Sequence, residues 1–237
     1  MTSLTLHPVT RERLQDLACF SEQHGKFRYC SCMRWRMRST DFGRSTKESR
    51  VAALERLVLD GKPTGVLAYL DGEPVGWCSV ASRESYDGLE RYGALARIDD
   101  QPVWAVVCFF VDRRFRRRGL TLALLKAAVA YAHSEGAKIV EGYPVIPGGR
   151  SYTYMGSPST FRSAGFRDVT PPDATRSFMR YFSLSHRSMT GFIPMIRTRQ
   201  HWEQNITAKR LTVACRSRRR TPSGPAENQC LPPGSER

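Results

Sequence analysis

The stretch Val103-Trp-Ala-Val-Val-Cys-Phe-Phe-Val-Asp-Arg-Arg-Phe-Arg-Arg-Arg-Gly-Leu-Thr-Leu-Ala-Leu-Leu125 decides the fold of this chain. Its first part, 103–111, is a nearly continuous apolar run, which is typical of a central strand covered on both faces. A basic turn follows, and a helix is predicted from Gly119 to Glu135, closed by Gly136. A buried strand that turns directly into a helix aims backbone N–H groups and the positive helix end at one spot. The stretch therefore predicts a phosphate-binding turn.

The charge of that turn agrees with a polyanionic ligand. Five of the six residues 113–118 are arginines, and Gly119 lets an anion approach the backbone closely. The same run could instead be a nucleic-acid patch. That interpretation leaves the flanking strand and helix unexplained, so a phosphorylated cofactor is favoured.

Outside this stretch, strand-like and helix-like segments alternate up to about residue 183. Further strands are predicted over 64–70, 74–81, 138–145, 166–169 and 177–182, and helices over 10–23, 45–60 and 158–164. Asp71-Gly72 separates the first two of these strands and predicts a hairpin turn. The order of the segments indicates a mixed α/β domain.

Two motifs resemble the GCN5-related N-acetyltransferase (GNAT) superfamily. Arg116-Arg-Arg-Gly-Leu-Thr121 is similar to the family's pyrophosphate signature Gln/Arg-x-x-Gly-x-Gly/Ala, from which it departs at Thr121. Phe161-Arg-Ser-Ala-Gly-Phe166 is similar to the family's Tyr-x-x-x-Gly-Phe. With the element order, the resemblance covers about residues 4–182. It implies a largely antiparallel twisted sheet with helices on both faces, in a domain over 1–184.

The resemblance also implies the reaction and its cofactor. A primary amine of a small molecule or peptide would attack the thioester of bound acetyl-CoA directly, without a metal. Thr121 would either crowd the pyrophosphate or donate its hydroxyl to it, and we favour the second. The implied cofactor contacts are made by strand residues along the pantetheine arm and by turn residues at the pyrophosphate: Phe109, Phe110 and Val111, then Arg116, Arg117, Arg118, Gly119, Leu120 and Thr121.

The two motifs do not identify the residues that would transfer protons in this reaction. Glu141 follows the cofactor helix and could accept the amine proton directly or through water. It could equally be a strand residue paired with an arginine. The family's usual acid is the tyrosine of Tyr-x-x-x-Gly-Phe, but here that position is Phe161. Tyr154, and to a lesser extent Tyr152, are therefore the candidate acids that would protonate the departing CoA thiolate.

The cysteines give no clear metal pattern. Cys19, His24, Cys30 and Cys32 could be assembled into a zinc site, but their spacing is not a usual ligand spacing, and unliganded thiols are favoured. Cys108 lies in the apolar strand and is most simply a core residue, with an acyl-accepting nucleophile as the alternative. The segment from Cys30 to Arg36 resembles a Cys-x-Cys-aromatic segment of some bacterial GNAT proteins, which names no substrate.

Composition sets the remaining limits. The chain has 237 residues and a net charge of +15, and its hydrophobic fraction of 41% is that of a globular protein. It has no apolar run long enough to span a membrane and no secretory signal, so we expect a cytoplasmic protein with reduced thiols. Residues 185–237 are basic, rich in proline and without apolar periodicity, and we expect a disordered tail without a specific function. A nucleic-acid or membrane-surface tether is the less favoured interpretation of the tail.

Two other classes of function remain open beside an enzyme. One is a catalytically silent acyl-CoA-binding module, which the departures at Thr121 and Phe161 allow. The other is a nucleic-acid-binding protein that uses the arginine run and the tail. The sequence fixes neither the acceptor amine nor the oligomeric state, for which a homodimer stays open.

Overall fold

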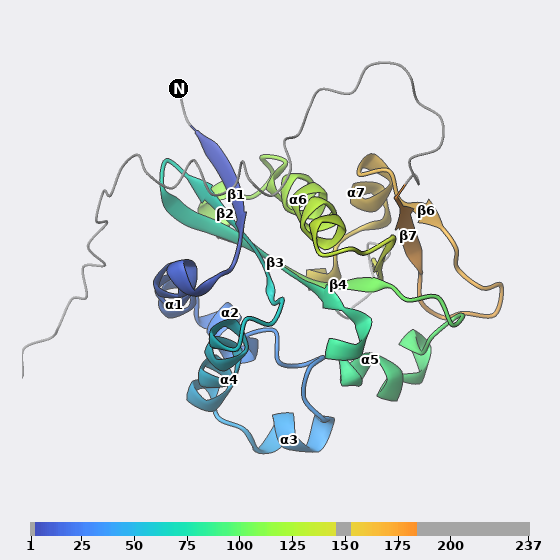
Figure 1. Cartoon of the computed structure of the whole chain (residues 1–237), viewed down its shortest axis with the longest axis horizontal. Helices are drawn as coiled ribbons and strands as arrows, with labels where there is room; N and C mark the ends of the chain where they lie inside the picture. Colours follow the sequence, from blue (N-terminus) through green and yellow to red (C-terminus); the bar gives the residue numbers. More distant parts are fainter. Residues whose placement is uncertain (1–2, 146–152, 184–237) are drawn as a thin grey trace, which may run out of the picture.

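A computed structural model describes residues 3–145 and 153–183 of the chain. Seven strands form one sheet in the order β1-β2-β3-β4-β5-β7-β6, and all neighbours are antiparallel except β4 and β5 (Figure 1). The strands are β1 (Leu4–Pro8), β2 (Gly65–Leu70), β3 (Glu73–Ser82), β4 (Trp104–Val111), β5 (Ile139–Gly142), β6 (Arg167–Asp168) and β7 (Met179–Phe182). The expected mixed, largely antiparallel fold is confirmed.

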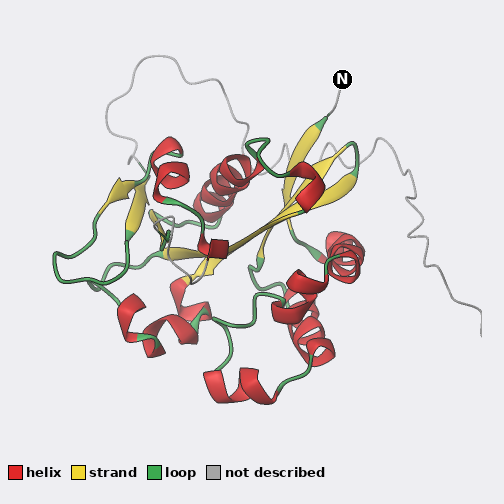
Figure 2. Ribbon diagram, turned by 180° about the vertical axis from the view of Figure 1, so that it is seen from behind, coloured by secondary structure: helices red, strands yellow, loops and turns green. Residues whose placement is uncertain are grey.

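Helices cover both faces of this sheet (Figures 1 and 2). α6 and α7 pack on one face, and α1, α2 and α4 on the other. The helices are α1 (Leu14–Gln23), α2 (Gly25–Cys30), α3 (Ser39–Arg44), α4 (Lys47–Leu59), α5 (Asp87–Arg91), α6 (Leu120–Ser134) and α7 (Pro158–Ser163). Short 3₁₀ turns complete the fold: η1 (Arg11–Arg13), η2 (Arg83–Ser85), η3 (Gly93–Leu95), η4 (Arg113–Phe115) and η5 (Thr153–Met155).

The central strands are apolar on both sides because each side faces helices. On β2, Val66 and Ala68 belong to the cluster under α6, whereas Leu67 and Tyr69 belong to the cluster under α1 and α4. Successive strand residues point to opposite faces, so a sheet covered twice needs a continuous apolar run. A third cluster, formed around Tyr86, lies between the α5 region and β4.

The predicted hairpin between β2 and β3 is confirmed. Asp71 and Gly72 form its turn, with φ angles of 50° and 85°. Two consecutive left-handed residues match the right-handed twist of the strands, which is why Asp-Gly suits this position.

The structure also contains elements that the sequence did not predict. β1 pairs with β2 along its whole length, and α2, α3 and α5 are each only five or six residues long. The helix expected from Thr10 begins instead as η1 and becomes α-helical at Leu14, and Thr10 makes no side-chain cap bond. The expected tail, 185–237, lies outside the described residues, so the domain boundary stays a prediction.

Candidate active site

β4 and β5 pair only over a short stretch. Trp104, Ala105 and Val106 face Val140, Glu141 and Gly142, and within the described ranges β4 then continues to Val111 without a partner on that side. The second half of β4 is paired with β3 on one side, so the backbone groups that point to the other side have no strand partner among the described residues. Buried backbone groups require hydrogen-bond partners, so an extended ligand can lie along this half of the strand. Phe109, Phe110 and Val111, the residues expected beside the pantetheine arm, lie in this half.

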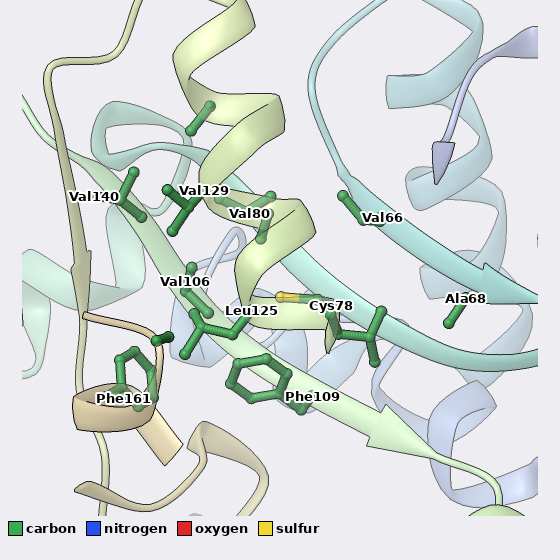
Figure 3. Close-up of a cluster of buried hydrophobic side chains, with 14 of the residues drawn as sticks. Val66, Ala68, Cys78, Val80, Val106, Phe109, Leu125, Val129, Val140 and Phe161 are labelled. Atoms are coloured by element: carbon green, nitrogen blue, oxygen red, sulfur yellow. The ribbon is translucent and has the colours of Figure 1, made fainter. Parts of the chain in front are cut away.

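Phe161 fills the point where the two strands begin to diverge (Figure 3). A Cβ atom on Gly142 would lie 2.0 Å from Cε1 of Phe161, so this ring packs directly on the β5 backbone. The same ring is edge-on to Phe109, with 6.2 Å between the centroids, and is fully buried. The residue at the position of the family's tyrosine is thus a core side chain in this chain.

The turn after β4 is organised by Asp112. Its carboxylate accepts the backbone N–H of Arg114 at 3.0 Å and the Arg114 Nε–H at 2.8 Å. Burial acts against ionisation of Asp112, but these bonds outweigh it and hold the pKa of the carboxyl below its ordinary value. Arg114 also donates to Glu73 at 2.7 Å. One arginine of the run is therefore neutralised by two carboxylates and serves the turn itself.

Two residues with positive φ bring the chain from the turn into α6. Arg117 has φ 60° and Gly119, the N-cap of the helix, has φ 75°. A left-handed arginine costs roughly 1 kcal/mol, a strain that is common at functional sites. A Cβ atom on Gly119 would meet no atom within 4 Å. The first N–H groups of α6 consequently face an open space at the positive end of a helix of 15 residues.

The expected pyrophosphate residues surround this space in different ways. Arg117 and Arg118 are exposed, and neither makes an ion pair with another described residue. Arg116 folds back, and its Nε–H donates to the Val111 carbonyl at 3.0 Å. Thr121 is half-buried in the first turn of α6, beside Gly119. The guanidinium groups of Arg117 and Arg118 therefore lie at the surface beside the helix end, that of Arg118 over the Phe115 ring.

Glu141 lies in a buried ion-pair network. Its Oε1 accepts the hydroxyl of Tyr143 at 2.7 Å and Nη1–H of Arg83 at 3.1 Å, and its Oε2 accepts Nε–H of Arg180 at 2.6 Å. The residue is 1% exposed. These are the contacts of a carboxylate paired with arginines, the second of the two interpretations that the sequence allowed.

The network joins separate parts of the fold. Arg83 also donates to Glu90 at 2.8 Å and to the Leu95 carbonyl at 2.6 Å, and Arg180 donates to both oxygens of Asp99. It therefore ties β5 and β7 to the segment 83–99. Sequence reasoning missed Arg83 and Arg180. A signal was available for Arg180, because a charged residue within an apolar strand must have a partner.

Tyr154 lies in η5, and this turn packs against β4. The Gly156 carbonyl accepts the Val145 N–H at 3.0 Å, and a Cβ atom on Gly156 would be 3.2 Å from Cε2 of Phe109. Tyr154 itself is half-buried at the edge of the third cluster. The structure thus brings its segment beside the strand expected to hold the cofactor. Tyr152, the other proposed acid, lies outside the described residues.

Among the described residues, no group of three or more histidines, cysteines or carboxylates could hold a metal ion. His24, one of the residues considered for a zinc site, instead faces Asp112, with 3.8 Å between its Nε2 and the carboxylate Oδ2. Burial lowers the pKa of His24, although the Asp112 carboxylate opposes this effect. In the same part of the chain, no helix is long and apolar enough to cross a membrane.

The model of the acetyltransferase (GNAT) family matches residues 30–143. The chain carries a GNAT-family domain. The match includes β2 to β5, the basic turn and α6, and it ends before the Phe161–Phe166 motif. The resemblance stated from the sequence is confirmed over these residues, and the family that they match is a family of acetyltransferases.

Solved structures include similar proteins. The protein yncA of Salmonella typhimurium, assigned as an acetyltransferase, was solved with acetyl-CoA. The two sequences are 18% identical, the likeness covers 79% of this chain and 98% of that one, and the TM-score is 0.47. The PaiA N-acetyltransferase of Thermoplasma acidophilum, solved with coenzyme A, is 11% identical over 76% of this chain and 99% of its own, with a TM-score of 0.45. No curated protein sequence matches the chain. Likenesses this distant assign no ligand or substrate to it.

Proposed function

We propose that this protein transfers an acetyl group from acetyl-CoA to a primary amine of a small molecule or peptide, by direct attack on the thioester. The observation that carries the proposal is the opening beside β4. One half of the strand lacks a partner among the described residues, and it leads into a helix end with open space at Gly119. An extended thiol arm and a pyrophosphate are the two parts of a ligand that these features suit.

In this proposal, binding and proximity supply most of the rate. Arg117, Arg118 and the first N–H groups of α6 hold the pyrophosphate, with the Thr121 hydroxyl donating to it. The backbone near Phe110 donates to the oxyanion of the tetrahedral intermediate. The protein fixes both ends of the cofactor, so the thioester is presented to the amine in one place.

Proton transfer is assigned to different groups. Tyr154 protonates the departing CoA thiolate, because Phe161 has no proton to give. Glu141 could accept the amine proton as a general base, but its two arginine partners favour a structural role. The proton of the attacking ammonium then leaves through water.

Binding of acetyl-CoA to two variants of Gly119 tests the cofactor site. Asparagine and aspartate have the same shape and both tolerate a left-handed backbone, so they differ in charge alone. Gly119→Asp should bind acetyl-CoA at least about tenfold more weakly than Gly119→Asn, a difference of ~1.4 kcal/mol. Equal affinities of the two folded variants in calorimetry would remove the main support for the site.

A screen of amines with detection of the released thiol tests the reaction. Thiol release that depends on one class of amine supports the transferase. A second candidate, a silent acyl-CoA-binding module, is favoured by one observation: the position of the usual acid is a fully buried phenylalanine. Tight binding of acetyl-CoA without release with any amine would favour that module.

A further inference from the structure

The Cys30–Cys32 segment has a strained backbone that the proposed function does not use. Ser31 and Cys32 have φ angles of 44° and 53°, although neither is glycine. Two consecutive left-handed residues of this kind cost roughly 1–2 kcal/mol each and persist only where the surroundings hold them. This backbone conformation places the Cys32 side chain against the sheet, where it is almost completely buried.

Cys32 lies beside the second half of β4. Its sulfur accepts the Trp77 Nε1–H at 3.0 Å. On β3 and β4, Trp77 pairs with Phe110, and Ser79 pairs with Cys108. Trp77 and Ser79 share one face of the sheet, and directly paired residues have Cβ atoms about 4.5–5.5 Å apart. The register therefore places Cys108 on the face of the sheet that Cys32 contacts, and Cys108 packs against the same cluster that contains Cys32.

The surroundings favour negative charge on one sulfur of this pair. Burial opposes ionisation of Cys32, but the hydrogen bonds from Cys108 and Trp77 and the charge of Arg36 outweigh it, so the pKa of Cys32 is lowered. The hydrogen bond to Cys32, followed by burial, raises the pKa of Cys108 well above its ordinary value. Arg36 is fixed there by its stacking on Tyr86, 4.4 Å from the ring centroid. The Cys32 thiol therefore ionises more readily than the Cys108 thiol.

We propose that Cys32 and Cys108 form a dithiol site that low-molecular-weight disulfides oxidise to an intramolecular disulfide. Cys108 is the less buried partner and meets the oxidant. The Cys108 thiol loses its proton and attacks the oxidant disulfide, which leaves a mixed disulfide and releases one small thiolate that takes up this proton. Cys32 then attacks the Cys108 sulfur and releases the second small thiol. Both protein protons leave on the two small thiols, so the exchange is balanced.

The other described cysteines lack this arrangement. Cys78 is buried in the cluster on the opposite face of the sheet, under α6. Burial raises the pKa of Cys30 to about 11, which makes it a poor thiolate. Cys19 lies on α1, with a glutamine side chain as its hydrogen-bond partner.

Oxidation would also reach the proposed cofactor site, a consequence that rests on the proposed function. Cys108 directly precedes Phe109 on β4, so a disulfide would tie the start of the pantetheine strand to the strained segment. Acetyl-CoA affinity should then differ between the oxidised and reduced protein. The formation of the disulfide itself does not depend on that function.

The test is peptide mapping of the full chain after exposure to oxidised glutathione under native conditions. Trypsin would release Cys32 in the peptide 29–34 and Cys108 in the peptide 98–113. We expect these two peptides to be linked, with reversal by dithiothreitol. Recovery of both peptides unlinked, or of Cys108 only as a stable glutathione adduct, would overturn the proposal.

Matched variants identify the sulfur, because the peptide 29–34 also contains Cys30. Cys30→Ser should keep the link, whereas Cys32→Ala and Cys108→Ala should each abolish it. A link that persists in Cys32→Ala would assign the reaction to Cys30 and refute the proposed pair. Circular dichroism of each variant verifies that it is folded, and the mapping of the wild-type chain stands without them.

Discussion

Replacement of Glu141 by glutamine should destabilise the protein strongly. The carboxylate accepts hydrogen bonds from Arg83, Arg180 and Tyr143 and is 1% exposed. An amide has one acceptor oxygen, so its NH₂ group would face a guanidinium, and one arginine would lose its buried carboxylate partner and keep only the partly exposed one, Glu90 or Asp99. Removal of one member of a buried pair costs about 3–5 kcal/mol. For a folded domain of this size, each kcal/mol lowers Tm by roughly 2–4 °C, so we expect a decrease of roughly 6–20 °C.

Thermal unfolding of Glu141→Gln beside Glu90→Gln measures this effect. Glu90 pairs with the same arginine, Arg83, but its side chain is 42% exposed, and exposed pairs are worth about 0–1 kcal/mol. The control should therefore lose only a few degrees. A Glu141→Gln protein that keeps its Tm but loses kcat by about 10²–10⁴-fold would refute the structural role and establish a general base.

Three further predictions concern the acid, the core and the tail. Tyr154→Phe should lower kcat by about 10²–10⁴-fold with acetyl-CoA affinity nearly unchanged, and Tyr152→Phe should matter less; two variants within about a factor of two of the wild type would exclude this loop as the acid. Phe161→Tyr should cost roughly 1–3 kcal/mol and leave kcat no higher, because the new hydroxyl would be buried against Gly142; a higher kcat in steady-state assays would show that the phenol reaches the thiolate. A chain ending at Leu184 should stay soluble, bind acetyl-CoA and keep its Tm within a few degrees; loss of binding would reveal a folded element in 185–237.

Local signals were enough to predict the elements around the cofactor turn. The apolar run before Asp112 required a strand covered on both faces, and Gly119 marked the start of the helix. Asp71-Gly72 predicted a hairpin that the structure contains. In each case the pattern lies within one short segment, where periodicity and turn chemistry act directly. Short elements such as β1 and α2 were not predicted, because five or six residues give too little periodicity to recognise.

The sequence by itself determined the resemblance to the GNAT family and the strand, turn and helix that carry the proposed phosphate site, because neighbouring residues encode both. Only the tertiary structure decided what Glu141, Phe161 and Cys32 contact. Arg83 and Arg180 lie 58 and 39 residues from Glu141 along the chain, and Phe161 meets Gly142 across two elements. No local pattern encodes such distances, because strand order and register bring these side chains together only when the whole sheet forms.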